Sequence, residues 1–195
     1  SVSGMLTVLV IDESRARAGE ICAGPALAGY QLAAILAGAD NLTAEVERLQ
    51  PDVILIDTDS PSRDTLENLA AMNKDMPRPV VIFTQEDGRE TIRDAVRAGV
   101  SAYVVDGLDP KRIKPIVEVA RARFEDTQAL RRELDEISQK LTDRKLVDKA
   151  KGVLMKARGL DEEAAYHAMR KLAMERGQTI AKVARDVIDM ARVLL

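Results

Sequence analysis

Positive charges lie in two rows along residues 144–158, a stretch whose periodicity is typical of an amphipathic helix. Its apolar face contains Leu146, Ala150, Val153, Leu154 and Ala157. One basic row consists of Arg144, Lys151 and Arg158, and the other of Lys145, Lys149 and Lys156. Gly152 lies between the rows, where alanine would favour the helix by roughly 1 kcal/mol. A glycine there allows a large, flat group to approach the backbone, and the cations suit the phosphates of a nucleic acid. The alternative is a solvent-exposed helix whose glycine packs against a neighbour.

Carboxylates that directly follow apolar runs form a second group of reactive side chains. Asp12 and Glu13 follow the run MLTVLVI, and Asp57 follows the run VILI. Three carboxylates in one cleft repel one another unless protons or a divalent cation neutralise them, and Mg²⁺ prefers such oxygen ligands. Asp12, Glu13 and Asp57 are therefore candidate Mg²⁺ ligands. We expect the hydroxyl of Thr84 to lie in the same pocket. The alternatives are a helix N-cap for Asp12 and a turn position for Asp57.

The composition of the chain indicates how many domains it can form and in which cellular compartment the protein works. The 195 residues, 46% of them hydrophobic, suffice for one ordinary domain and a smaller module. No apolar run approaches the roughly 18 residues of a membrane span, and no signal-peptide pattern opens the chain. A single cysteine, Cys22, cannot form an internal disulfide. We therefore expect a cytoplasmic protein.

Charge is distributed unevenly along the chain. Residues 141–195 contain 12 Lys and Arg against 8 Asp and Glu, whereas residues 1–140 contain 17 against 24. An acidic front and a basic tail indicate two modules with different partners. Aromatic residues are only 3% of the chain, which argues against a base-stacking sheet of the RRM or OB type. The sequence shows no nucleophile–base pairing, glycine-rich phosphate loop or metal cluster, so we expect no enzymatic activity and no required cofactor.

Apolar runs and helical stretches alternate through the first half of the chain. Strands are expected at 5–11, 30–36, 53–56, 79–83 and 101–105. Helices are expected at 41–49, 63–73 and 87–98, with another beginning at Asp109-Pro110. Continuous apolar runs alternating with helices predict a parallel sheet covered on both faces. Five such strands fit the α/β flavodoxin-like arrangement, in which functional groups gather at the carboxyl ends of the strands.

A long helix is expected after the fifth strand, because residues 111–141 contain no glycine and only an early proline, Pro115. Its apolar residues follow a 3-4 spacing that is cleanest at Leu130, Leu134, Ile137 and Leu141. This pattern favours a coiled coil within a homodimer. The alternative is a single helix that packs on its own sheet, and it stays open for the first half of the stretch.

Three short helices are expected in the tail, each with one apolar face. Gly159 suits the end of the first helix, and Asp161 suits the N-cap of the second. The second helix leaves Arg170 and Lys171 outside its apolar side, and the third carries a stripe from Ile180 to Ala191. We expect an all-α three-helix bundle. His167, the only histidine, is expected on the surface.

The first half resembles the receiver domain of response regulators. The motifs that carry the resemblance are VLVIDES, DVILIDTDSP, VVIFTQ and GVSAYVV. By this resemblance Asp12 and Glu13 match the acidic pair that holds Mg²⁺, Asp57 the phospho-accepting aspartate, and Thr84 the hydroxyl that reports phosphorylation. The family's Lys-Pro pair is replaced here by Asp106-Gly107. A further negative charge in the pocket disfavours a phosphate dianion by at least about 1 kcal/mol, which argues against phosphorylation as the input.

The tail resembles the ANTAR domain, an RNA-binding antitermination module. The matching residues are Ala150-Lys151-Gly152, Leu154-Met155, Glu163-Ala164, Tyr166, Met169-Arg170 and Ala173. Together the two resemblances indicate an ANTAR-type response-regulator antiterminator. The motifs DVILIDTDSP, GVSAYVV and ARFEDTQALR are most similar to regulators of nitrate and nitrite assimilation. That resemblance implies binding to paired hairpins in a leader RNA, under the control of a nitrate-sensing partner protein.

These observations predict three segments and leave two functions to be compared. We expect a receiver-like domain at 1–112, a coiled-coil connector at 113–140 and an ANTAR domain at 141–195. The favoured function is RNA-binding antitermination through the basic residues 144–158 together with Arg170 and Lys171. The alternative is a phosphorelay receiver whose helical tail docks a protein partner. Binding to duplex DNA is a minor option.

Overall fold

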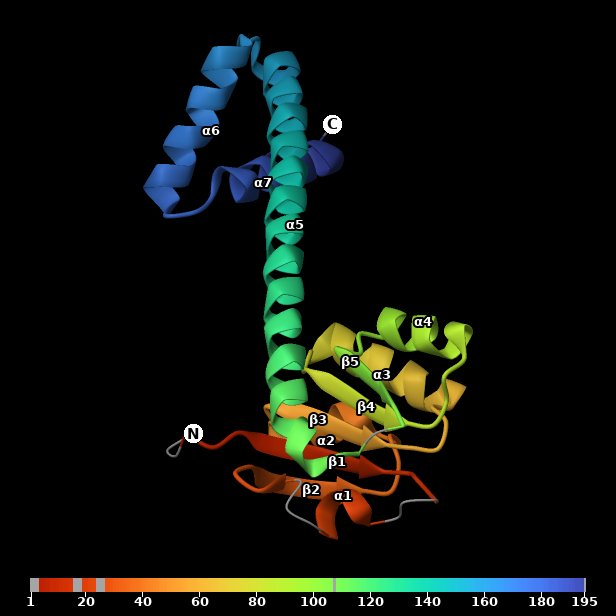
Figure 1. Ribbon diagram of the computed structural model, residues 1–195. Coiled ribbons are helices and arrows are strands. Elements are labelled where there is room, and N and C mark those ends of the chain that lie inside the picture. The colour runs from red at the N-terminus through yellow and green to blue at the C-terminus, as the bar shows by residue number, and fades with distance from the viewer. Residues whose placement is uncertain (1–3, 16–18, 24–26, 107, 195) are drawn as a thin grey trace. The chain divides into compact units, whose positions relative to one another are not determined.

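A five-stranded parallel sheet forms the first half of the protein. The computed structural model describes residues 4–15, 19–23, 27–106 and 108–194. The strands are β1 (Thr7–Asp12), β2 (Gln31–Leu36), β3 (Val53–Asp57), β4 (Val80–Thr84) and β5 (Ala102–Val105), in the order β2-β1-β3-β4-β5 (Figure 1). Every neighbouring pair is parallel. The predicted flavodoxin-like sheet is therefore confirmed.

Helices connect the strands and then form the whole second half. Their bounds are α1 (Glu20–Ala23), α2 (Leu42–Leu49), α3 (Arg63–Asp75), α4 (Arg89–Arg97), α5 (Pro110–Arg158), α6 (Glu162–Arg176) and α7 (Ile180–Leu194). The chain divides into two compact units, residues 1–128 and 129–195. Helix α5, with 49 residues, contributes to both units.

Two apolar cores lie on opposite faces of the sheet. Leu9, Ile54 and Ile82 point to one face, where they pack with residues of α2, α3 and α4. Val10 and Leu55 point to the other face, with Ile21 of α1 and the first turns of α5. Successive side chains of a strand alternate between faces, so burial of both faces requires the continuous apolar runs seen in the sequence.

The beginning of α5 belongs to the first unit. Ile113, Val117 and Ala120 are fully buried against the sheet. They recur at helical spacing and therefore form one stripe that faces the sheet. We expected the receiver-like domain to end at residue 112, whereas the compact unit extends to residue 128. Packing of α5 on its own sheet, the alternative considered above, thus holds for the first half of this helix.

The middle of α5 exposes the seam predicted from the 3-4 spacing. Leu130, Leu134, Ile137 and Leu141 are 62%, 65%, 50% and 56% exposed. The helix continues without a break at residue 141, so the connector and the first tail helix are one element rather than two. We call these four residues the α5 seam.

The second unit is a small bundle made from the end of α5 with α6 and α7. Its core contains Val147, Ala150, Met169, Ala173, Val183, Ala184 and Ile188. Gly159 has φ +66° directly after α5, a conformation that favours glycine. The Asp161 carboxylate accepts a hydrogen bond of 2.7 Å from the Ala164 N–H, which caps α6 as predicted. The expected three-helix bundle is therefore confirmed.

Candidate functional site

The acidic strand ends meet at the carboxyl edge of the sheet. Asp12 is paired in register with Asp57 across β1 and β3. The Glu13 N–H donates a hydrogen bond of 2.8 Å to the Asp57 carbonyl oxygen. The Asp57 side chain has 0% of its surface exposed. The structure thus brings together the three backbone positions predicted from separate parts of the chain.

The Glu13 and Asp12 carboxylates each have a partner within the protein. The Thr65 hydroxyl lies 3.1 and 3.3 Å from the two Glu13 carboxylate oxygens. Burial raises the pKa of Glu13, the Thr65 hydrogen bond opposes this shift, and the nearby charge of Asp40 adds to it. Asp12 accepts a 2.8 Å hydrogen bond from the Gly19 N–H.

Magnesium binding at these carboxylates stays a prediction. Within the described residues, no three His, Cys, Asp or Glu side chains gather as a group that could hold a metal ion. The Glu13 carboxylate is directed to Thr65 in this arrangement.

Asp59 connects the loops around the pocket and was not singled out from the sequence. Its carboxylate accepts hydrogen bonds from the Ser14 hydroxyl at 2.8 Å and the Arg15 N–H at 3.0 Å. Its carbonyl oxygen accepts one from the Thr84 hydroxyl at 3.0 Å. The buried Thr84 hydroxyl is therefore engaged with the loop after β3 rather than with a carboxylate. The sequence feature that could have pointed to Asp59 is its position two residues after Asp57, in the loop that follows β3.

Asp106 directly follows β5 and its side chain is exposed. Its N–H donates a hydrogen bond of 3.1 Å to the Thr84 carbonyl oxygen, which places its backbone beside the end of β4. Its φ of +56° is uncommon for a residue other than glycine. A contribution of the Asp106 charge to the pocket stays a prediction. Gly107 lies outside the described residues.

The second candidate site lies on the last turns of α5. Lys145, Lys149 and Lys156 are exposed. In the described part of the chain, none of the three lies within 4.0 Å of a carboxylate oxygen as an ion pair. Gly152 is one helical turn from both Lys149 and Lys156. We call these three residues the lysine row.

Gly152 has no packing role within the described part of the chain. A Cβ atom added there would meet nothing within 4 Å, and the residue is exposed. The alternative of a glycine required by a neighbouring helix is therefore not supported. Arg144, Arg158, Arg170 and Lys171 are also exposed, as is His167.

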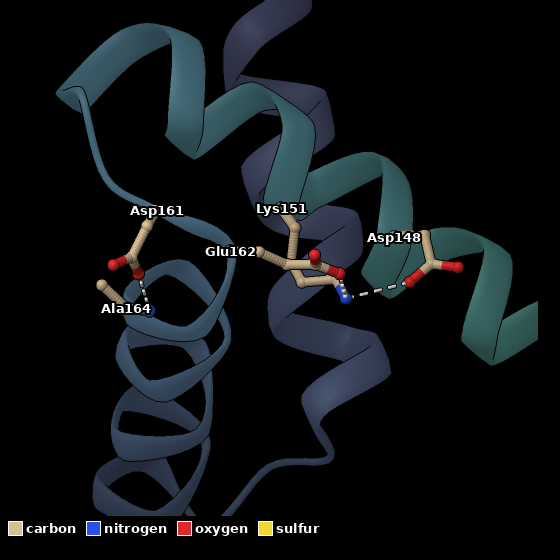
Figure 2. A network of polar contacts seen from close by, with 5 residues as sticks. All are labelled: Asp148, Lys151, Asp161, Glu162 and Ala164. Atoms are coloured by element: carbon tan, nitrogen blue, oxygen red, sulfur yellow. Dashed lines mark hydrogen bonds and ion pairs between the residues drawn. The ribbon is translucent and has the colours of Figure 1, made fainter.

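Lys151 differs from the lysine row because its charge is already engaged. Its ammonium lies 2.9 Å from Glu162 Oε1 on α6 and 3.1 Å from Asp148 Oδ1 on α5, as Figure 2 shows. Only 15% of its side chain is exposed. The hydrogen bond with Glu162 and that with Asp148 raise the pKa of Lys151. Lys151 thus joins α6 to α5, while a contact between Lys151 and RNA stays a prediction.

A groove of about 620 Å³ opens beside Gly152 in the second unit. It is lined by Asp143, Arg144, Val147, Asp148, Lys151, Gly152, Met155, Glu162, Tyr166 and Ile180. Tyr166 is 43% exposed and Met155 is 40% exposed. Sequence reasoning did not assign a role to either side chain, because only the fold of α6 against α5 places them at one groove.

No helix within the described residues combines the length and the apolar character needed to cross a membrane.

A family match lies within the second unit of the protein. Residues 135–188 match the ANTAR domain. The transcriptional regulatory protein PdtaR of Mycobacterium tuberculosis is 29% identical over 161 residues, covering 83% of this chain and 78% of PdtaR. The nitrate regulatory protein of Klebsiella oxytoca is 36% identical over 85 residues, covering 44% of this chain and 22% of that protein.

Solved structures show the fold of the first half. A CheY-like response regulator receiver domain protein from Methanospirillum hungatei has a TM-score of 0.52 and 21% identity, covering 63% of this chain and 98% of that structure. The signal receiver domain of a diguanylate cyclase from Desulfovibrio desulfuricans has a TM-score of 0.53 and 19% identity, covering 62% and 97%. The residues that match the ANTAR domain follow this receiver-like fold in the sequence. The chain therefore combines a receiver-like fold with a region that matches the ANTAR domain, and it is similar to ANTAR-type response regulators.

Proposed function

We propose that this protein is an RNA-binding transcription antiterminator that acts on hairpins in a leader RNA. The observation that carries the proposal is the lysine row beside Gly152, within the residues that match the ANTAR domain. Exposed lysines without carboxylate partners keep their charge for phosphates, and each phosphate contact releases counterions from the nucleic acid. The protein acts in the cytoplasm as a regulator rather than as an enzyme.

We also propose that two copies bind the RNA as a homodimer through the α5 seam. Four large apolar side chains at 3-4 spacing are at least half exposed on one helix. A second copy of the same helix would bury them as a coiled coil. This pairing would bring two ANTAR domains to one RNA, which suits a leader with paired hairpins.

Control by a nitrate-sensing partner protein, rather than by phosphorylation, is the third element of the proposal. The similarity to a nitrate regulatory protein supports the link with nitrate. Asp106 follows β5 where the receiver family has a Lys-Pro pair, and a negative charge at the pocket would disfavour a phosphoryl group there. We infer that the partner masks the RNA-binding surface until nitrate or nitrite is sensed.

A gel-shift titration against the leader RNA of a nitrate-assimilation operon tests the proposal. The double variant Lys149→Ala/Lys156→Ala should bind more weakly than wild type, and the slope of log affinity against log salt should fall by roughly one per lysine. Lys182→Ala is the matched control, because Lys182 lies 2.7 Å from Asp186 in an ion pair on α7. Equal binding by wild type and the double variant at moderate salt would contradict the proposal.

Two additions to the same titration separate the alternatives. A nitrate-sensing partner protein that masks the lysine row should displace the RNA from this protein when nitrate is absent. Unlabelled duplex DNA should compete less effectively than hairpin RNA. Preferential binding to the duplex would instead indicate a DNA-binding regulator.

A further inference from the structure

We propose that the two copies of the homodimer pair their α5 seams in an antiparallel orientation. The inference rests on the proposed homodimer and deepens it, because the orientation sets how far apart the two RNA-binding surfaces lie. The four seam residues follow a 4-3-4 spacing along the single helix α5 (Figure 1). This spacing is the same in both directions, so the apolar side chains alone do not choose between a parallel and an antiparallel pair.

The seam is open to a second helix. All four of its side chains are at least half exposed. Ala150, which packs in the core of the ANTAR bundle, follows Leu141 by nine residues, or about two and a half helical turns. The bundle core therefore lies on the opposite side of α5 from the seam.

Charged side chains flank the seam at positions that two paired helices bring together. In the heptad whose a and d positions are the seam residues, Glu133 and Lys140 occupy g positions, and Arg131, Ser138 and Lys145 occupy e positions. All five are exposed. In the described part of the chain, neither Glu133 nor Lys140 forms an ion pair within its own copy. Their charges are thus available to a second copy.

A parallel pair would bring like charges together at the end of the seam. Parallel helices place each g position beside the e position five residues later on the other helix. Asp126 would then attract Arg131, but Lys140 would face Lys145. Arg144, at the d position after Leu141, would face Arg144 of the second copy in the same layer. Both of these contacts are repulsive.

An antiparallel pair replaces these contacts with attractive ones. Because one helix runs in reverse, both helices present their g positions on one side of the seam and their e positions on the other. Glu133 then lies beside Lys140 of the second copy, and two-fold symmetry repeats the contact. Arg144 comes level with Thr127 and Asp126 of the second copy instead of with another arginine. Charge complementarity therefore selects a second copy in the antiparallel orientation.

This orientation separates the two lysine rows. Gly152 lies about 16 residues beyond the midpoint between Leu134 and Ile137, and each helical residue adds about 1.5 Å. The Gly152 residues of the two copies therefore lie about 50 Å apart along the helix axis. A parallel pair would place them at the same level. Lysine rows that far apart contact two separate hairpins rather than two sides of one stem.

Reversal of the charge of Lys140 distinguishes the two orientations. In the antiparallel pair, Lys140→Glu places two carboxylates beside each other twice, and it should weaken dimerisation about fivefold. In a parallel pair the new glutamate would face Lys145 and strengthen the dimer. The double variant Glu133→Lys/Lys140→Glu should restore wild-type dimerisation. Sedimentation equilibrium of the full chain measures the dissociation constant, and Arg132→Glu, on the side of α5 opposite the seam, is the matched control.

Disulfide formation gives an independent measure of the orientation. In a Cys22→Ser background, Thr127→Cys should not crosslink to itself, because residues 127 of the two antiparallel copies lie about 25 Å apart along the axis. In a parallel pair they would face each other in one layer. A mixture of Thr127→Cys with Arg144→Cys should crosslink between copies, because these two positions share a layer of the antiparallel pair.

The outcomes separate a wrong orientation from a wrong function. An unchanged or tighter dimer with Lys140→Glu, no recovery in the double variant, or a disulfide in Thr127→Cys alone would overturn the antiparallel pairing and leave the homodimer in place. A wild-type protein that stays monomeric would overturn both. RNA binding through the lysine row is decided by the gel-shift titration alone, and circular dichroism should show wild-type helix content in each variant.

Discussion

At the scale of single residues, lysines of similar sequence context have different roles. Lys149 and Lys151 are two positions apart, so they lie on different sides of α5. Lys149 is exposed without an ion pair among the described residues, whereas Lys151 contacts Asp148 and Glu162. Phosphate binding is therefore proposed for the lysine row, whereas Lys151 joins α6 to α5.

Replacement of Lys151 by methionine should change how stability depends on pH. The carboxylates of Glu162 and Asp148 raise the pKa of Lys151 in the folded protein. A raised pKa means that its stabilising contribution is complete below the unfolded value of about 10.4 and disappears as the pH rises through the folded value. On going from about pH 8 to about pH 11, wild type should therefore lose more thermal stability than Lys151→Met.

Thermal unfolding followed by circular dichroism at the two pH values measures this difference. Lys145→Met is the matched control, because Lys145 is exposed on the same helix without an ion pair in the described residues. It should lose stability at high pH as wild type does. An identical loss in wild type and Lys151→Met would show that the bridge contributes nothing in solution.

At the scale of elements, α5 performs three tasks along one continuous helix. Its first turns complete the core of the receiver-like unit through Ile113 and Val117. Its last turns supply Val147 and Ala150 to the ANTAR bundle. The α5 seam lies between these two buried stripes and contributes to neither core.

The substitution Leu134→Asp should convert a homodimer into a monomer. A coiled coil buries its seam, and an aspartate there would have to lose its hydration without an opposite charge. Light scattering after size-exclusion chromatography should give half the wild-type mass. Gln139→Asp adds the same charge on the opposite side of α5 and should leave the mass unchanged. A wild-type protein that is already monomeric would refute the pairing.

At the scale of the whole molecule, the question is which input reaches the ANTAR domain. The receiver-like unit has the acidic strand ends of its class, but Asp106 follows β5 where the receiver family has a lysine. We expect acetyl phosphate with Mg²⁺ to leave both RNA affinity and mass unchanged, and Asp57→Asn to behave as wild type. Phosphate labelling that disappears in Asp57→Asn and alters the mass would favour the phosphorelay alternative.

The elements of the fold were predictable from the sequence because local patterns determine them. Buried parallel strands need continuous apolar runs, and the five runs coincide with β1 to β5 within a few residues. The N-cap at Asp161 and the left-handed Gly159 follow from residue type in the same way. Asp12 and Asp57 could be placed together because parallel strands end at a common edge.

Only the tertiary structure decided which charges are engaged and where the surface is hollow. The sequence placed Lys151 and Lys149 in neighbouring basic rows, and the approach of Glu162 on α6 distinguishes them. The same approach places Tyr166 at the groove beside Gly152. Helical periodicity specifies the face of one helix but not which residues of another helix come opposite it. The sequence by itself therefore determined the modules and the basic helix, while packing between helices decided which charges on that helix are engaged within the protein.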